Sequence, residues 1–190
     1  MEKTYIEDKK FDHVDFTETV FERADYENCS FTNCNFSNQD LSKINFFDCT
    51  FTGCNVSLAK LGKTAFKDWK FNGCKLLGLH FDDCHEFLFN VDFDNCQLNL
   101  STFYKRKLKK IIFKDCSLHD VEFTETDLTN AVFDNCDLLR ATFRNTILEK
   151  ADFRTAYNYS IDPDENHIKK AKFSSAGIAG LLDKYNIDIE

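Results

Sequence analysis

The chain has 190 residues, 43% of them hydrophobic, and a net charge of −8 at pH 7. This length suits one domain, and the acidic balance argues against direct binding to nucleic acid, whose phosphates would repel it. No apolar run is long enough to span a membrane, and the polar residues 1–5 do not begin a signal peptide. We therefore expect a cytoplasmic protein that does not contact a membrane.

A five-residue repeat begins at Phe11 and runs through most of the chain. Large apolar residues occupy every fifth position up to Phe81, and after a slip of two residues the series continues from Leu88 to Phe153. All 29 positions hold Phe, Leu, Tyr or Val. A helix repeats every 3.6 residues and a strand every 2, so neither explains a step of five. The step predicts a solenoid in which four five-residue sides close one square coil.

The positions around each large apolar residue also follow the repeat. All nine cysteines stand two residues before such a position or its continuation, where Ala is also common. We interpret them as inward-pointing apolar fillers without disulfides, because free Cys packs as a small hydrophobe; redox sensing by this cysteine ladder is the less favoured alternative. Two residues after the apolar position, Asn, Asp or Gly occurs in 16 of 29 cases. These residues favour turns, so the corners are predicted there.

Three units match the motif Ala-(Asp/Asn)-Leu-x-x closely: Cys34-Asn35-Phe36, Cys136-Asp137-Leu138 and Ala151-Asp152-Phe153. On these motifs the chain resembles the pentapeptide-repeat family over about residues 9–160. The resemblance implies an all-β fold, a right-handed quadrilateral β-helix of about seven coils, which we place at residues 1–160. Residues 20 apart, or 22 apart across the slip, would then stack on one face. One face would be all Phe, and in the second half another would be all Leu: Leu88, Leu108, Leu128 and Leu148.

The slip predicts a short bulge over residues 82–88. Cys84, His85 and Glu86 lie in it and resemble metal ligands in type. Three adjacent residues on one irregular turn rarely converge on a single ion, so no metal site is expected.

Residues 161–190 are predicted to form a loop, an α-helix over residues 176–185 and a short strand. Four apolar residues of this helix fall at i, i+3, i+4 and i+7 and so share one stripe: Ile178, Leu181, Leu182 and Tyr185. The helix is predicted either to cap the solenoid or to pack on a second copy in a C2 dimer. The tail is similar to the C-terminal dimerisation element of Qnr- and MfpA-type pentapeptide proteins, and this favours a homodimer.

The sequence contains no phosphate-binding loop, nucleophile elbow or zinc pattern, so we predict a non-enzymatic binding protein without a cofactor. The resemblance to Qnr-type proteins implies an acidic rod that looks like duplex DNA, engages DNA gyrase or topoisomerase IV and is associated with quinolone resistance. The alternative is a generic protein-interaction scaffold with an unidentified partner. The candidate partner surface combines carboxylates with a basic cluster: Asp12, Asp15, Glu18, Glu22, Asp25, Glu27, Asp92, Asp94, Lys105, Lys107, Lys109 and Lys110.

Overall fold

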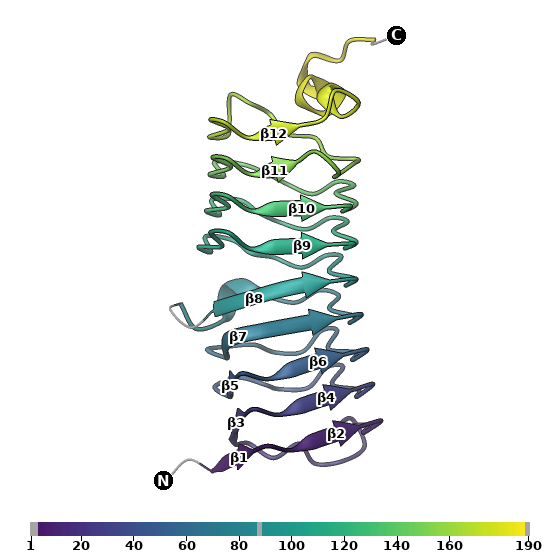
Figure 1. Ribbon diagram of the computed structural model, residues 1–190, viewed down its shortest axis with the longest axis vertical. Helices are drawn as coiled ribbons and strands as arrows, with labels where there is room; N and C mark the ends of the chain where they lie inside the picture. Colours follow the sequence, from purple (N-terminus) through teal and green to yellow (C-terminus); the bar gives the residue numbers. More distant parts are fainter. Residues whose placement is uncertain (1–3, 87–88, 189–190) are drawn as a thin grey trace.

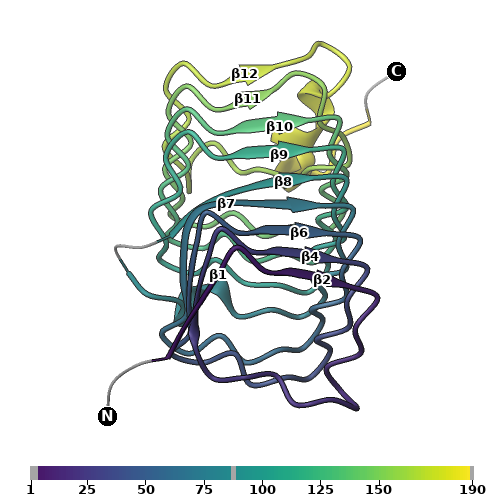
Figure 2. The ribbon, with the colours of Figure 1, turned by 60° about the horizontal axis from the view of Figure 1, so that its bottom comes forward.

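The chain winds into an all-β solenoid of about eight coils (Figure 1). The computed structural model describes residues 4–86 and 89–188, so the predicted apolar position Leu88 lies outside the described residues. Every strand pairing is parallel. Figure 2 looks toward the N-terminal end and shows the coils superposed around a common bore. Within the described residues, no helix is both long and apolar enough to cross a membrane.

Four columns of paired residues form the four faces of the solenoid. Face 1 is built from β2 (Lys10–Asp12), β4 (Ser30–Thr32), β6 (Thr50–Thr52), β7 (Ala65–Asn72), β8 (Phe89–Asp94), β9 (Ile112–Lys114), β10 (Val132–Asp134), β11 (Asp152–Phe153) and β12 (Lys172–Phe173). Face 4 begins with β1 (Tyr5–Glu7), β3 (Asp25–Glu27), β5 (Asn45–Phe47) and the start of β7, and continues as bridges from Lys107 to His167. Faces 2 and 3 consist of single bridges, such as Asp15↔Asn35 and Asp40↔Lys60.

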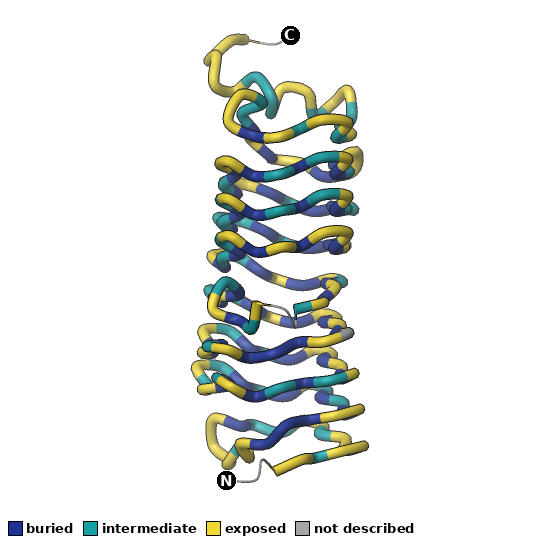
Figure 3. Tube along the Cα trace, turned by 90° about the vertical axis from the view of Figure 1, so that its left-hand side faces the viewer, coloured by how far each residue is buried: buried dark blue, intermediate teal, exposed yellow. Residues whose placement is uncertain are grey.

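The bore is filled by stacked side chains, as the repeat predicts. The rings of face 1 run from Phe11 through Phe113 to Phe173, and neighbouring centroids lie 4.5 to 5.6 Å apart. This interval is close to the spacing of about 4.8 Å between paired strands, so each ring contacts the equivalent ring of the next coil. The burial pattern alternates along each coil accordingly (Figure 3). The all-Phe face is therefore confirmed.

The corners lie where the turn-forming residues predict them. From Asn28 to Lys63, and again from Asn95 to Lys150, every fifth residue has a φ between 49° and 64°. Asn, Asp and Gly adopt this left-handed region at low cost, which explains their frequency there. Other corners hold Lys or Leu, whose side chains disfavour a positive φ, so the backbone is somewhat strained there.

Trp69 occupies an inward small-residue position and points into the bore. Trp69 is 3% exposed, and its ring centroid lies 4.3 Å from that of Phe66 and 4.4 Å from that of Phe51. The strand β7 is continuous over eight residues here, whereas earlier coils have two strands of three residues. An extended path gives the indole room inside the bore.

The C-terminal α-helix predicted over residues 176–185 is wrong. The segment forms two 3-10 turns instead, Ile178–Leu181 and Asp183–Tyr185, and the described residues contain no α-helix. Gly177 and Gly180 disfavour a helix, and both pack against Tyr159. Parallel pairing continues past residue 160, since β12 pairs with β11. Residues 186–188 of the expected terminal strand are irregular, and 189–190 lie outside the described residues.

Candidate functional site: the charged surfaces of the rod

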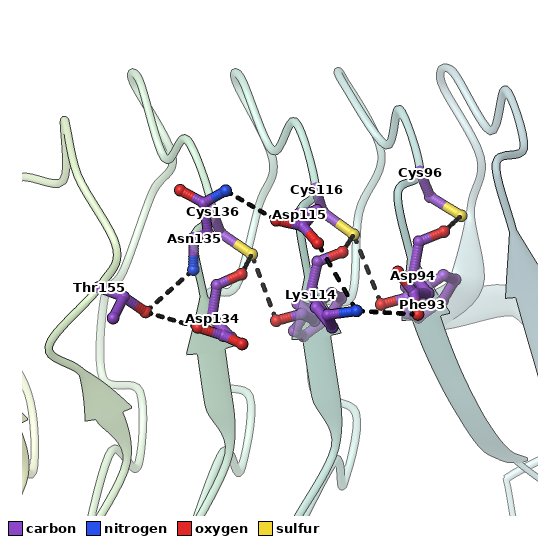
Figure 4. A network of polar contacts seen from close by, with 11 residues as sticks. Phe93, Asp94, Cys96, Lys114, Asp115, Cys116, Asp134, Asn135, Cys136 and Thr155 are labelled. Carbon is purple, nitrogen blue, oxygen red and sulfur yellow. Dashed lines mark hydrogen bonds and ion pairs between the residues drawn. The ribbon is translucent and has the colours of Figure 1, made fainter.

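The nine cysteines are buried and do not form disulfides. The thiols of Cys116 and Cys136 donate to the main-chain carbonyls of Phe93 and Phe113, at 3.6 and 3.3 Å (Figure 4). Thr126 occupies the same repeat position, and its hydroxyl donates to the Phe103 carbonyl at 2.8 Å. These side chains therefore satisfy inward carbonyls in addition to filling space. Sequence reasoning missed this donor role, although the recurrence of Cys and Thr where Ala would fit was a signal for it.

The thiols of Cys49 and Cys74 are held in their neutral form. Burial raises the pKa of Cys49 to about 12, and the contact with the Cys54 thiol raises the pKa of Cys74 to about 12. Thiolate is the nucleophilic species, so these cysteines are poor nucleophiles at neutral pH.

One of the predicted surface carboxylates is buried. Asp25 is 2% exposed, and its two carboxylate oxygens accept hydrogen bonds from the main-chain and side-chain amides of Asn45, at 3.0 and 2.9 Å. Its prediction as part of the partner surface is wrong, because the next coil covers it. The remaining carboxylates are exposed or half-buried: Asp12, Asp15, Glu18, Glu22, Glu27, Asp92 and Asp94.

The acidic charge is concentrated at the N-terminal end of the rod. Residues 1–50 contain 11 acidic and 5 basic side chains, whereas residues 51–190 contain 21 and 19. Four of these carboxylates belong to four different sides of the first coils: Asp12, Asp15, Glu22 and Glu27. The structure thus gathers the predicted acidic residues as a ring around one end, and not as a stripe along one face.

Hydrogen bonds keep part of this ring ionised. The carboxylate of Asp15 accepts hydrogen bonds from the Thr17 hydroxyl at 2.6 Å and the Thr17 amide at 2.8 Å, and these bonds lower the pKa of Asp15. Asp12 lies 2.8 Å from His13. The carboxylate of Asp15 therefore presents negative charge at neutral pH.

Asp92 and Asp94 lie apart from the ring, on β8. The ammonium of Lys114 lies 3.5 Å from the carboxylate of Asp94 and 3.7 Å from that of Asp115 (Figure 4). The charge of Asp94 is therefore partly compensated within the coil stack.

The basic cluster divides into paired and unpaired lysines. Lys105 lies 3.5 Å from Glu125, and Lys109 lies 3.2 Å from Asp127. Within the described part of the chain, neither Lys107 nor Lys110 has a carboxylate within ion-pair distance, and both are exposed. These two lysines provide the free positive charge of the cluster.

Arg106 points into the bore and holds the bulge. Its guanidinium donates to the carbonyls of Cys84 at 3.1 Å and His85 at 2.9 Å, and it lies 4.8 Å from the ring centroid of Phe89. Burial lowers the pKa of Arg106. Arg106 thus supplies the hydrogen-bond donors for the carbonyls of Cys84 and His85, which lie in the two-residue slip.

The predicted dimer residues lie at the C-terminal end with different exposures. The side chains of Ile178 and Tyr185 are 49% and 58% exposed. Leu181 and Leu182 are half-buried, and Leu181 packs against the core. The four residues therefore do not share one solvent-facing stripe, because a 3-10 turn does not have the 3.6-residue period on which that stripe was predicted.

The solved structures with a similar fold include a QnrB1 variant and HetL. The structure of a trypsin-treated variant of QnrB1, described as a plasmid-mediated fluoroquinolone resistance protein, matches over 100% of both chains with a TM-score of 0.63 and 16% identity. HetL, described as a pentapeptide-repeat protein involved in heterocyst differentiation regulation from the cyanobacterium Nostoc sp. strain PCC 7120, matches over 90% of this chain and 86% of its own. Its TM-score is 0.56 and its identity 13%. At these identities the likeness shows the fold alone.

The sequence itself identifies the family. No curated protein sequence matches the chain, but the family model described as the pentapeptide repeat region matches residues 24–86 and 87–162. These two matches contain most of the first run of the five-residue repeat, all of the second run and most of the described coils. The chain therefore belongs to the pentapeptide-repeat family.

Proposed function

We propose that this protein is a non-enzymatic modulator of a type II topoisomerase such as DNA gyrase. The acidic ring at its N-terminal end would occupy a basic groove that otherwise holds DNA. The observation that carries this proposal is the concentration of negative charge at one end of a narrow rod: residues 1–50 account for −6 of the net charge of −8. A basic groove attracts such a surface by the same electrostatic forces that attract phosphates.

The fold likeness to QnrB1, a fluoroquinolone resistance protein, supports the choice of target. The proposal also includes a right-handed winding of the coils and a cytoplasmic location. It includes as well a homodimer formed through the C-terminal end, where Ile178 and Tyr185 expose apolar surface.

A DNA gyrase supercoiling assay with and without a fluoroquinolone tests the proposal. Near-stoichiometric protein is expected to inhibit supercoiling or to protect the enzyme from the drug. Replacing Glu18, Glu22 and Glu27 by Lys should abolish the effect, whereas the same change of charge at Asp115, Glu125 and Glu165 should reduce it far less. No effect of the wild-type protein on supercoiling or on drug sensitivity would reject the proposal.

A protein-interaction scaffold is the second candidate, and one observation favours it. The C-terminal half of face 4 is basic although the molecule is acidic, so the rod has two surfaces of opposite charge. HetL, which shares the fold, is described as acting in regulation.

A further inference from the structure

The coil stack opens between β8 and the residues that lead into β9. In three later coils, the amides of Val132, Asp152 and Lys172 donate to main-chain carbonyls of the preceding coil at 2.8 to 3.0 Å. The equivalent amide of Ile112 donates to the side chain of Asp92 at 3.2 Å. The β8–β9 ladder contains only the pairs Phe93↔Phe113 and Asp94↔Lys114, so it lacks the Asp92–Ile112 pair whose equivalents are present in the later coils. β8 accordingly diverges from β9 toward its start (Figure 1).

The two-residue slip is the physical cause of this opening. Phe66 pairs with Phe89, 23 residues on, whereas Trp69 and Val91 are 22 apart, so the register shifts within one strand pair. The chain entering β8 therefore cannot follow the regular path that would continue the hydrogen-bond ladder to the next coil.

A groove of about 260 Å³ lies at this opening, and we call it the seam groove. Its apolar lining includes Phe89, Val91 and Ile112, and its charged lining includes Lys107, Lys110 and Asp92. Drug-sized ligands occupy pockets of about 300–1,000 Å³, so the seam groove is small and suits a single apolar side chain. The Asp92 carboxylate at its edge is already engaged by the amide of Ile112.

Positive charge continues from the seam groove along face 4. The basic face consists of exposed lysines on this side of the later coils: Lys107, Lys109, Lys110, Lys150, Lys169 and Lys170. Only Asp127 and Glu149 oppose them at the same repeat positions, and Asp127 already pairs with Lys109. An apolar groove with a cationic rim thus opens onto a cationic surface.

We propose that the seam groove and the basic face bind an acidic, extended segment of a partner protein that inserts one apolar side chain. Its carboxylates contact Lys107 and Lys110, and its apolar side chain lies against Ile112 and Val91. Lysine ammonium groups act as single point charges, so they bind separate carboxylates and do not require the planar geometry that arginine prefers. Nucleic acid fits less well, because a phosphodiester backbone has no apolar side chain for the groove and the net charge of −8 repels a dense polyanion.

Fluorescence anisotropy with defined probes tests this proposal on the full chain. The main probe is a labelled eight-residue peptide of Asp and Glu with one central Leu, and a second peptide has Ser in place of that Leu. We expect saturable binding of the Leu peptide that weakens as salt is raised, and at least fivefold weaker binding of the Ser peptide. A single-stranded oligonucleotide with the same number of charges should bind more weakly than the Leu peptide.

The variants separate the site from general electrostatics. K107E with K110E should weaken binding of the Leu peptide at least tenfold. K60E with K63E is the matched control, because Lys60 and Lys63 are exposed and hold the same repeat positions on face 3; it should change binding less than threefold. Thermal melting of both variants checks that the coils remain folded. Failure of the Leu peptide to saturate, equal loss in both variants, or equal binding of all three probes would overturn the proposal.

Discussion

At the scale of single residues, the two inward positions of each repeat stabilise the coil in different ways. The large apolar residue buries area and stacks along the bore, as Phe113 does between Phe93 and Phe133, whose centroids lie 5.2 and 5.1 Å away. A Cys or Thr at the position two residues earlier donates a hydrogen bond to an inward carbonyl, as Cys136 does. Both roles require the side chain to point inward, so each can be tested by substitution or by titration.

Replacing Phe113 by Ala should lower the free energy of unfolding by about 3–5 kcal/mol, because a fully buried aromatic side chain is lost. Urea denaturation measures the change. The control is Ile112→Ala on the same strand, since Ile112 is 42% exposed. A loss below about 0.5 kcal/mol for Phe113→Ala, the range of ordinary surface substitutions, would contradict the inward register.

The buried thiols predict a loss of stability at alkaline pH. The pKa values of Cys49, Cys74, Cys96 and Cys116 are raised to about 12, from 9.0. The unfolded chain therefore releases these protons first, and stability present below pH 9 declines as pH rises toward 12. Each such thiol contributes a slope of about 1.4 kcal/mol per pH unit within this window.

Thermal melting from pH 7 to 11, followed by circular dichroism, measures this decline. Thiolate absorbance of the folded protein should stay low at pH 9 to 10, and a mild alkylating reagent should leave the thiols unmodified at pH 8. Thiolate forming in the folded protein with a midpoint near pH 9 would contradict the burial and revive a redox role for the ladder.

At the scale of elements, the repeat predicts the coils well and their irregularities poorly. Spacing alone indicates the corners and the all-Phe face, because each depends only on position within the five-residue period. The slip was visible in the sequence, but the clamp that Arg106 places on the carbonyls of Cys84 and His85 was not. That contact joins residues more than 20 positions apart across an irregular turn.

The C-terminal turns depend on close packing between glycine and tyrosine. A Cβ atom at Gly180 would lie 2.1 Å from the carbonyl oxygen of Tyr159 and 2.9 Å from its ring. Gly180→Ala should therefore displace the turns and lower stability by about 1–3 kcal/mol, with faster hydrogen exchange confined to residues 174–188. Gly62→Ala is the control, because its nearest contact would be the Ser42 hydroxyl at 3.3 Å. Unchanged exchange in Gly180→Ala would contradict this packing.

At the scale of the whole molecule, charge and apolar surface are distributed unequally along the rod. The acidic ring lies at the N-terminal end, the basic face along the C-terminal half, and the exposed side chains of Ile178 and Tyr185 at the C-terminal end. Association through the C-terminal ends would keep the two acidic rings far apart and so avoid their repulsion.

Substituting Asp for both Ile178 and Tyr185 should convert the proposed homodimer to a monomer, because each change places a charge in an apolar contact. Light scattering coupled to size-exclusion chromatography measures the mass. The control is Leu100→Asp, a substitution of a leucine that is 67% exposed on an earlier coil. A wild-type protein that is monomeric at high concentration would contradict the dimer.

The sequence by itself determined which side chains enter the bore, where the chain turns and which residues stack. Those features follow from a local period that every coil repeats. Only the tertiary structure decided that Asp25 is covered by the next coil, that the stack opens beside Asp92, and that the C-terminal segment forms 3-10 turns against Tyr159. Each of these depends on contacts between residues from different coils at places where the period is broken, and a five-residue pattern carries no information about them.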